Sequence, residues 1–139
     1  MLKMSNEDRE RFLADLHVGV IAIERPDRAP LAVPIWYAYE PGGELSIFTS
    51  EGTLKDKLIR AAGRFSFTAQ DEAPPYKYVT VEGDVTSVGP ADETDYRALA
   101  VRYLGDEAGN QFTDQTYSPS SIVIRMRPKK WLSVDYSDE

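Results

Sequence analysis

The sequence contains no cysteine and only one histidine in its 139 residues. The absence of cysteine excludes disulfides, thiolate metal sites and cysteine nucleophiles. The single histidine, His17, excludes a catalytic or zinc site built on several histidines, and we expect it to have a structural hydrogen-bonding role. Common catalytic and phosphate-binding motifs, such as Gly-x-Ser-x-Gly, His-Glu-x-x-His and Gly-x-Gly-x-x-Gly, are absent as well. An enzyme with so few acid–base groups would take its chemistry from a cofactor.

Long apolar runs and an excess of positive charge are also missing. No stretch approaches the roughly 20 apolar residues of a membrane span, and the polar N-terminus does not resemble a signal peptide. The formal net charge is -7, whereas nucleic-acid binding usually needs a basic face. The sequence therefore predicts a cytoplasmic protein that binds neither nucleic acid nor membrane.

What is present is an ordinary globular composition, with 42% hydrophobic and 28% charged residues. We expect a single domain over residues 1–139, long enough to bury a core without staples. Apolar periodicity predicts helices over 5–16, 53–62 and 90–104, and strands over 17–24, 31–40, 45–50, 64–70, 77–87 and 120–126. We expect residues 106–119 to form a loop or a short helix, and 128–136 to form a bend, with or without a last strand segment. About six antiparallel strands with three helices predict a small β-barrel with helical connections.

The stretch 47–60 combines a strand end, a tight turn and a helix start at Thr53. Thr53 and Asp56 have the spacing of a capping box. Lys55 and Lys57 fall in or near the first turn, where the helix dipole is positive and backbone N–H groups are unpaired. Two cations there make sense if an anion binds among them, and the alternative is that both are solvated surface lysines.

A helical projection of this segment predicts which side is buried. The apolar positions share one side, and the two lysines flank it. Asp56 and Arg60 are expected to point away from the core. The expected apolar stripe consists of Leu54, Leu58, Ala61 and Ala62.

The strand over 31–40 has two unusual features. Pro34 cannot donate to a strand ladder, so it predicts a bulge or a sheet edge. Trp36, Tyr37 and Tyr39 follow it, and Tyr76, Tyr78 and Trp131 lie near later strand starts. Planar ligands favour such surroundings, and the alternative is a barrel core with a dimer interface.

Several segments of the chain follow one another in the order found in a known family. The chain reads Leu31-Ala-Val-Pro-Ile-Trp-Tyr-Ala-Tyr, Glu44-Leu-Ser-Ile-Phe-Thr-Ser, Thr53-Leu-Lys-Asp-Lys-Leu, Gly63-Arg-Phe-Ser-Phe and Tyr78-Val-Thr-Val-Glu-Gly. It closes with Arg127-Pro-Lys-Lys-Trp-Leu-Ser-Val-Asp-Tyr. In order and spacing, residues 11–136 resemble the pyridoxamine 5'-phosphate oxidase-like FMN-binding split-barrel superfamily, including the branch that uses the deazaflavin coenzyme F-420.

The resemblance implies a mainly β protein, a six-stranded antiparallel split β-barrel with an N-terminal helix and helical connections. It implies a homodimer with cofactor sites at the subunit interface, and a cofactor that is FMN or, as the alternative, F-420. The resemblance places four residues along the cofactor ring system, namely Val33, Pro34, Ile35 and Trp36. It places Thr49 and Ser50 at ring or ribityl oxygens, and Lys55 and Lys57 at the phosphate. Tyr78 and Trp131 would lie near the site and come from one or both subunits.

Two departures from the oxidase pattern shape the expected function. The paired Arg-Lys at the oxidase phosphate is Leu54-Lys55 here, with Lys57 as the replacement cation. The substrate-binding arginines and histidine of the oxidase have no evident match, which argues against pyridoxamine-phosphate oxidation. We expect an FMN- or F-420-dependent oxidoreductase that transfers hydride to or from a small molecule. The alternatives are a non-catalytic protein that sequesters or senses a flavin or haem, and a structural dimer with a decayed pocket.

Overall fold

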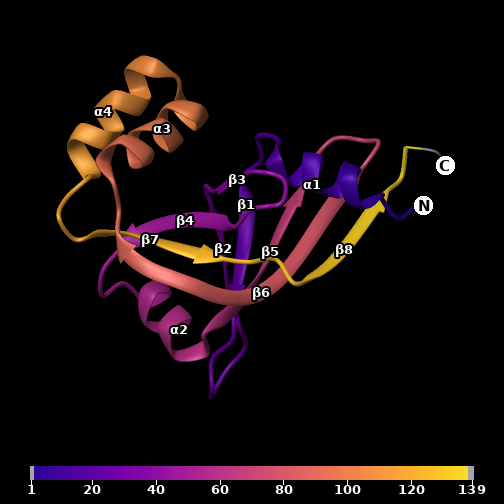
Figure 1. Cartoon of the computed structure of the whole chain (residues 1–139), viewed down its shortest axis with the longest axis horizontal. Coiled ribbons are helices and arrows are strands. Elements are labelled where there is room, and N and C mark those ends of the chain that lie inside the picture. Colours follow the sequence, from indigo (N-terminus) through magenta and orange to yellow (C-terminus); the bar gives the residue numbers. More distant parts are fainter. Residues whose placement is uncertain (1, 138–139) are drawn as a thin grey trace.

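The computed structural model describes residues 2–137, which form a curled antiparallel sheet with four helices (Figure 1). The elements in chain order are α1 (Asn6–Ala14), β1 (Gly19–Ile23), β2 (Leu31–Ile35), β3 (Ala38–Tyr39), β4 (Leu45–Ser50), α2 (Leu54–Ala62), β5 (Arg64–Gln70), β6 (Lys77–Pro90), α3 (Glu93–Leu104), α4 (Asp106–Thr116), β7 (Ser121–Met126) and β8 (Lys130–Asp135). Among these helices, none combines the length and hydropathy that a membrane crossing requires.

The sheet curls on itself into a split barrel. Its strand order is β2-β1-β5-β6-β7-β4-β3, with β8 paired to β6. The long strand β6 serves both halves, because it pairs with β5 and β8 first and, after a register shift between Val85 and Ser87, with β7. Such a bulge bends a strand and increases its twist. The two ends of the order, β2 and β3, are separated in the chain only by Trp36 and Tyr37, so the edges of the sheet meet there.

The predicted fold class is confirmed, with a difference in strand number. The structure has eight strands instead of six. The expected strand over 31–40 divides at Trp36, where the chain crosses from one sheet edge to the other. The closing segment contains a last strand, β8, which the sequence allowed and which pairs with β6. The edge position expected for Pro34 is confirmed, since β2 is the first strand of the order.

The core lies inside the barrel and is built from the inward positions of the strands. Ile21, Leu45, Phe67 and Ile124 are fully buried there. A Cβ atom at Gly19 would lie 1.9 Å from the Phe67 ring, so this position is restricted to glycine. Helix α1 packs against β3 and β6 and contributes two buried residues of its own, Phe12 and Leu13.

Helix α2 is rotated relative to the sequence-based expectation. Asp56 and Ile59 are buried, whereas Leu54 is 55% exposed, so the prediction that Asp56 points away was wrong. The carboxylate turns inward because it accepts hydrogen bonds from the Gly52 N–H (2.8 Å) and from the Arg60 Nε–H (2.6 Å). Burial by itself raises the pKa of Asp56, but these hydrogen bonds and the charge of Arg60 outweigh it and lower the pKa. The Asp56 carboxylate therefore already places one negative charge at the start of this helix.

Residues 93–116 form a helical hairpin, α3–α4, that stands off the ends of β4 and β7 (Figure 1). The polar segment that follows Gly105, expected as a loop or a short helix, is the eleven-residue helix α4. The two helices approach closely at Gly109, where a Cβ atom would lie 2.5 Å from the Val101 Cα. Arg97 joins them by donating to the Asn110 Oδ1 (2.9 Å) and to the Asp114 carboxylate (2.9 Å).

Candidate functional site

A cleft of about 510 Å3 lies between the α3–α4 hairpin and the split of the barrel. Strands β2 and β4 form its barrel side, and α3 and α4 form its hairpin side. The lining residues are Val18, Pro34, Ile35, Trp36, Phe48, Thr49, Ser50, Thr53, Lys55, Tyr96, Leu99, Ala100, Phe112 and Ser121. The volume is within the range of small-molecule and cofactor sites.

The part of the cleft at the start of α2 is lined by hydroxyl groups and one cation. The Thr49 and Thr53 hydroxyl oxygens are 3.0 Å apart, and Ser50 is paired with Ser121 across β4 and β7. Lys55 is the only charged side chain among the described residues that line the cleft. Hydroxyl donors beside an ammonium group are suited to a phosphate or another anion.

The other part of the cleft is an aromatic wall, which we define as Trp36, Phe48, Tyr96 and Phe112. The ring centroids of Trp36 and Phe112 are 5.2 Å apart, and those of Phe48 and Tyr96 are 5.6 Å apart. Tyr96 and Phe112 connect these pairs, at 6.4 Å and an interplanar angle of 12°. Together the four rings, each beside the next in space, form an apolar surface of the kind against which a flat ligand stacks.

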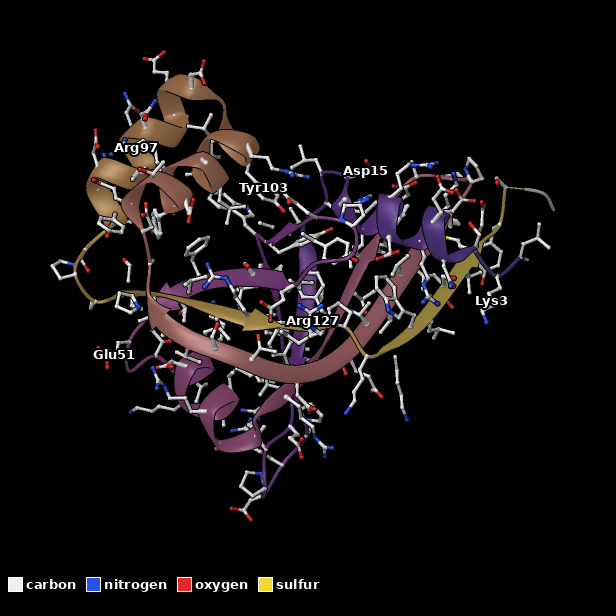
Figure 2. The ribbon with its side chains drawn as sticks, in the orientation of Figure 1. Lys3, Asp15, Glu51, Arg97, Tyr103 and Arg127 are labelled. Atoms are coloured by element: carbon white, nitrogen blue, oxygen red, sulfur yellow. The ribbon has the colours of Figure 1, made fainter. Side chains whose placement is uncertain are left out.

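Tyr103 attaches the hairpin to the barrel beside this wall. Its ring stacks on Trp36 at 5.0 Å and 6°, and its hydroxyl donates to the His17 carbonyl (2.5 Å) and accepts from the Tyr37 N–H (3.3 Å). Burial raises the pKa of Tyr103, so its hydroxyl stays protonated at neutral pH. Figure 2 shows Tyr103 where the hairpin meets the rest of the molecule, on the side toward Asp15.

The edge strand β2 leaves backbone groups available along the cleft. In the described part of the chain, β2 pairs with β1 on one side and has no strand on its other side. The free N–H and C=O groups of an edge strand can bind another chain or a ligand. Because Pro34, Ile35 and Trp36 also line the cleft, this edge borders the site.

The structure brings six of the ten site residues expected from the sequence to this cleft. They are Pro34, Ile35, Trp36, Thr49, Ser50 and Lys55. Val33 lies next to them on β2 but packs against the core. Lys57 is exposed, and because residues two apart on a helix point to nearly opposite sides, it is directed away from Lys55.

The remaining two expected residues lie away from this cleft. Tyr78 is next to the buried Val79 on β6 and therefore points to the outer face of the sheet. Trp131 packs against the barrel core, with its ring 6.1 Å from that of Tyr39 and the Arg9 guanidinium 4.6 Å from its centroid. Within one subunit, neither side chain contributes to the cleft lining.

Sequence reasoning missed the hairpin side of the cleft. Tyr96, Leu99, Ala100 and Phe112 were not among the expected site residues, although each lines the cleft. A signal existed for Phe112, which is the one large apolar residue in the polar helix α4 and therefore indicates a packed position. Their convergence with Trp36 is a long-range contact that no local pattern reveals.

The single histidine is structural, as expected. The His17 Nε2 atom is 3.0 Å from the Phe12 carbonyl oxygen, and its ring stacks on Phe12 at 4.4 Å. His17 does not line the cleft, and neither does any described aspartate or glutamate. Acid–base chemistry in the cleft would therefore use Lys55, Tyr96, a bound group or solvent.

The fold and the cleft define a split-barrel protein with a cleft where the sheet edges meet. Residues 5–131 match the family model described as Pyridoxamine 5'-phosphate oxidase, and the chain belongs to this family. In sequence alone, no curated protein is significantly similar to it.

Solved structures share the fold. A conserved hypothetical protein from Mycobacterium tuberculosis is similar at a TM-score of 0.74 and 22% identity, over 96% of this chain and 86% of that one. An F-420 reductase is similar at a TM-score of 0.64 and 26% identity, over 88% of this chain and 94% of that one. An FAD-binding protein from Mesorhizobium loti is similar at a TM-score of 0.65 and 19% identity, over 95% of this chain and 94% of that one.

Proposed function

We propose that this protein is an oxidoreductase that uses a flavin-type cofactor, FMN or the deazaflavin F-420, and acts on a small molecule by hydride transfer. The observation that carries the proposal is the composition of the cleft, in which an anion-binding part lined by hydroxyls and Lys55 adjoins an aromatic wall. A phosphorylated cofactor with a flat ring fits this cleft with its phosphate at Lys55 and its ring beside Trp36, which leaves the Tyr96 and Phe112 end of the wall to a second molecule. The family match and the similarity to an F-420 reductase and an FAD-binding protein support this class of ligand.

In this proposal the barrel side of the cleft holds the cofactor. Lys55 binds the phosphate, and Thr49 and Ser50 donate to ribityl or ring oxygens. The β2 edge from Val33 to Trp36 lies along the ring system. When bound, such a cofactor accepts or donates a hydride, and the protein orients it and excludes water.

The phosphate interaction rests on Lys55 more than on the helix dipole. The Gly52 N–H already donates to Asp56, and the Asp56 N–H donates to the Thr53 hydroxyl (3.3 Å). These two contacts occupy donors that an external anion would otherwise use. Lys57, on the exposed side of α2, would act only as a distant charge.

The charge of the cleft favours FMN over F-420. F-420 carries an oligoglutamate tail beyond its phosphate, and this tail needs further cations. Lys55 is the one cationic residue among the described lining residues, and Arg60 on the same helix is engaged by Asp56. FMN, with a single phosphate, matches a site with one lysine.

We further propose a homodimer that forms on the outer face of the sheet. Pro34, Val20, Thr68, Thr80 and Leu132 form a row of directly opposed positions across β2, β1, β5, β6 and β8. Val20 is 39% and Leu132 57% exposed on this uncharged row. Because Pro34 also lines the cleft, a second copy on this face would border the cofactor site, and Tyr78 of the partner subunit is a candidate contact.

A second candidate function is non-catalytic binding of a flavin or haem. It is favoured by one observation, namely that the described cleft lining contains no carboxylate or imidazole. Such a protein would bind the cofactor without oxidising or reducing a second molecule.

Titration of purified protein with FMN, F-420 and riboflavin tests these proposals. We expect FMN to bind in the micromolar range or tighter, with a characteristic change in flavin absorbance and fluorescence, and to bind more tightly than riboflavin. Reoxidation of the reduced, cofactor-loaded protein by an added electron acceptor would distinguish an enzyme from a binding protein. If neither FMN nor F-420 binds below the millimolar range, the proposal of a flavin-type cofactor is wrong.

A further inference from the structure

We propose that the hairpin side of the cleft selects a flat, uncharged aromatic molecule as substrate, and that Phe112 is the residue that determines this specificity. The inference rests on the proposed function, because it assigns the barrel side to the cofactor. It assigns to the α3–α4 hairpin the surface that the second molecule contacts.

The first observation is the lack of charge on the hairpin side. Its lining residues are Tyr96, Leu99, Ala100 and Phe112. The Thr116 hydroxyl donates to the Phe112 carbonyl (2.7 Å) and lies 2.8 Å from the Tyr96 hydroxyl, so the Tyr96 O–H donates to Thr116. An anionic substrate placed there would lose its hydration without gaining a donor, which is costly in an apolar site.

The two arginines of the hairpin are engaged elsewhere. Arg97 bonds to Glu93 (3.3 Å) and Asp114 (2.9 Å), and Arg102 donates to the Ala14 carbonyl (2.7 Å). None of these four residues lines the cleft. The hairpin therefore separates its charge from its ring surface, and only the ring surface faces the site.

The second observation is the position of Phe112 within the aromatic wall. Phe112 is in contact with Trp36 at 5.2 Å and lies nearly parallel to Tyr96. Tyr103 holds the Trp36 ring from its other side at an interplanar angle of 6°. The wall is thus preorganised, and a flat molecule can stack on it without first ordering the side chains.

Equilibrium dialysis on the protein loaded with oxidised cofactor tests the inference. The probes are menadione, which is flat and uncharged, and pyridoxal 5'-phosphate, which is flat and anionic. We expect menadione to bind at least tenfold more tightly. Phe112→Ala should weaken menadione binding by about tenfold and change cofactor affinity by less than about twofold, since loss of a stacking partner has this scale.

Two further variants keep the result interpretable. Phe112→Leu preserves apolar bulk and helix packing but removes the ring, and it should still weaken menadione binding about threefold or more. Gln115→Ala, at an exposed position of the same helix, should leave both affinities unchanged. The inference is overturned if Phe112→Ala binds menadione as the wild type does, or if pyridoxal 5'-phosphate binds more tightly than menadione.

The cofactor titration separates this inference from the proposed function. A protein that binds FMN normally but does not bind menadione contradicts the inference alone. A protein that binds no flavin-type cofactor contradicts the proposed function. In that case, dialysis of menadione against the cofactor-free protein and its Phe112→Ala variant still decides whether the hairpin surface binds flat aromatic molecules.

Discussion

The barrel and the α3–α4 hairpin are stabilised in different ways. The barrel encloses a continuous core whose residues, such as Phe67, Ile47 and Val81, are fully buried. In the hairpin the buried apolar residues are Leu99 and Ala100. Its helices are joined by hydrogen bonds of Arg97 and Tyr96, by the stacking of Tyr96 on Phe112, and by close contact at Gly109. It is attached to the barrel by aromatic stacking and by hydrogen bonds from Tyr103 and Arg102.

This difference assigns different tasks to the two regions. Apolar burial is the largest stabilising contribution in a domain, so the barrel determines whether the chain folds. A region with few buried apolar contacts can open at a lower free energy than the global transition. Because the cleft lies between the two regions, a ligand bound there would contact a rigid barrel side and a hairpin that can shift as a unit with its rings packed together.

A phenylalanine-to-alanine substitution in each region should give the largest difference in unfolding free energy. Phe67→Ala removes a fully buried ring and should lower the free energy of unfolding by about 3–5 kcal/mol. Phe112→Ala removes a partly exposed ring and should cost about 1–2 kcal/mol. Urea denaturation of both variants measures these values. Equal losses would contradict the division between a stable barrel and a weakly attached hairpin.

The next test concerns the barrel side of the cleft. Lys55→Ala should weaken FMN binding by about 1.5–3 kcal/mol, the scale of a charge-assisted hydrogen bond, and leave riboflavin binding nearly unchanged. Lys57→Ala, two positions along on the exposed side of α2, is the matched control and should change FMN binding by less than about 0.5 kcal/mol. Isothermal titration calorimetry compares the four affinities. If FMN and riboflavin lose equally, Lys55 is not at the phosphate.

Gly109→Ala should loosen the hairpin while the barrel stays folded. The added Cβ would lie 2.5 Å from the Val101 Cα, so the helices must separate, at a cost of about 1–3 kcal/mol. Hydrogen exchange should rise in α3 and α4 and remain slow in β5 and β6. Gly89→Ala is the matched control, because a Cβ there meets no atom within 4 Å. Faster exchange throughout the sheet would show that the two regions unfold together.

The sequence predicted the barrel better than the hairpin, for a physical reason. Strands such as Leu45–Ser50 and Arg64–Gln70 agree with prediction at both ends, because alternation of buried and exposed side chains is a local property. Helix α4 has only one large apolar residue, Phe112, and its stability depends on contacts with α3. The helical projection of α2 failed because it could not include the hydrogen bond from Gly52 that turns Asp56 inward.

The candidate site divides along the same line. Lys55, Thr49 and Pro34 could be expected from a helix start, a strand end and a sheet edge, which are all local features. Phe112 and Tyr96 reach the cleft only through the packing of distant segments. The sequence marks Phe112 as a packed position, but the convergence of these residues at the cleft was beyond prediction from the sequence.

Acidification should weaken the barrel side at Asp56. Its pKa is lower in the folded protein than the ordinary value of 3.8, so its contribution to stability is present above that value and is lost as the pH falls through the folded pKa. We expect the difference in unfolding free energy between wild type and Asp56→Asn to be largest near neutral pH and to shrink below about pH 4. Chemical denaturation between pH 3 and 7 measures it. A difference that is independent of pH would show that the Asp56 charge is not involved.

The smallest expected effect is on the attachment of the hairpin itself. Tyr103→Phe keeps the ring that stacks on Trp36 but removes the hydroxyl that bonds to the His17 carbonyl and the Tyr37 N–H. The global free energy of unfolding should fall by only about 1 kcal/mol, the net worth of such hydrogen bonds. The local change should be clearer when it is measured by tryptophan fluorescence. In a Trp131→Phe background, Trp36 is the only tryptophan of the chain. Its emission should shift to longer wavelength in Tyr103→Phe, because the hairpin moves away and water enters the cleft. Unchanged emission would mean that stacking alone holds the hairpin in place, and that the hairpin is less easily displaced than its few buried contacts suggest.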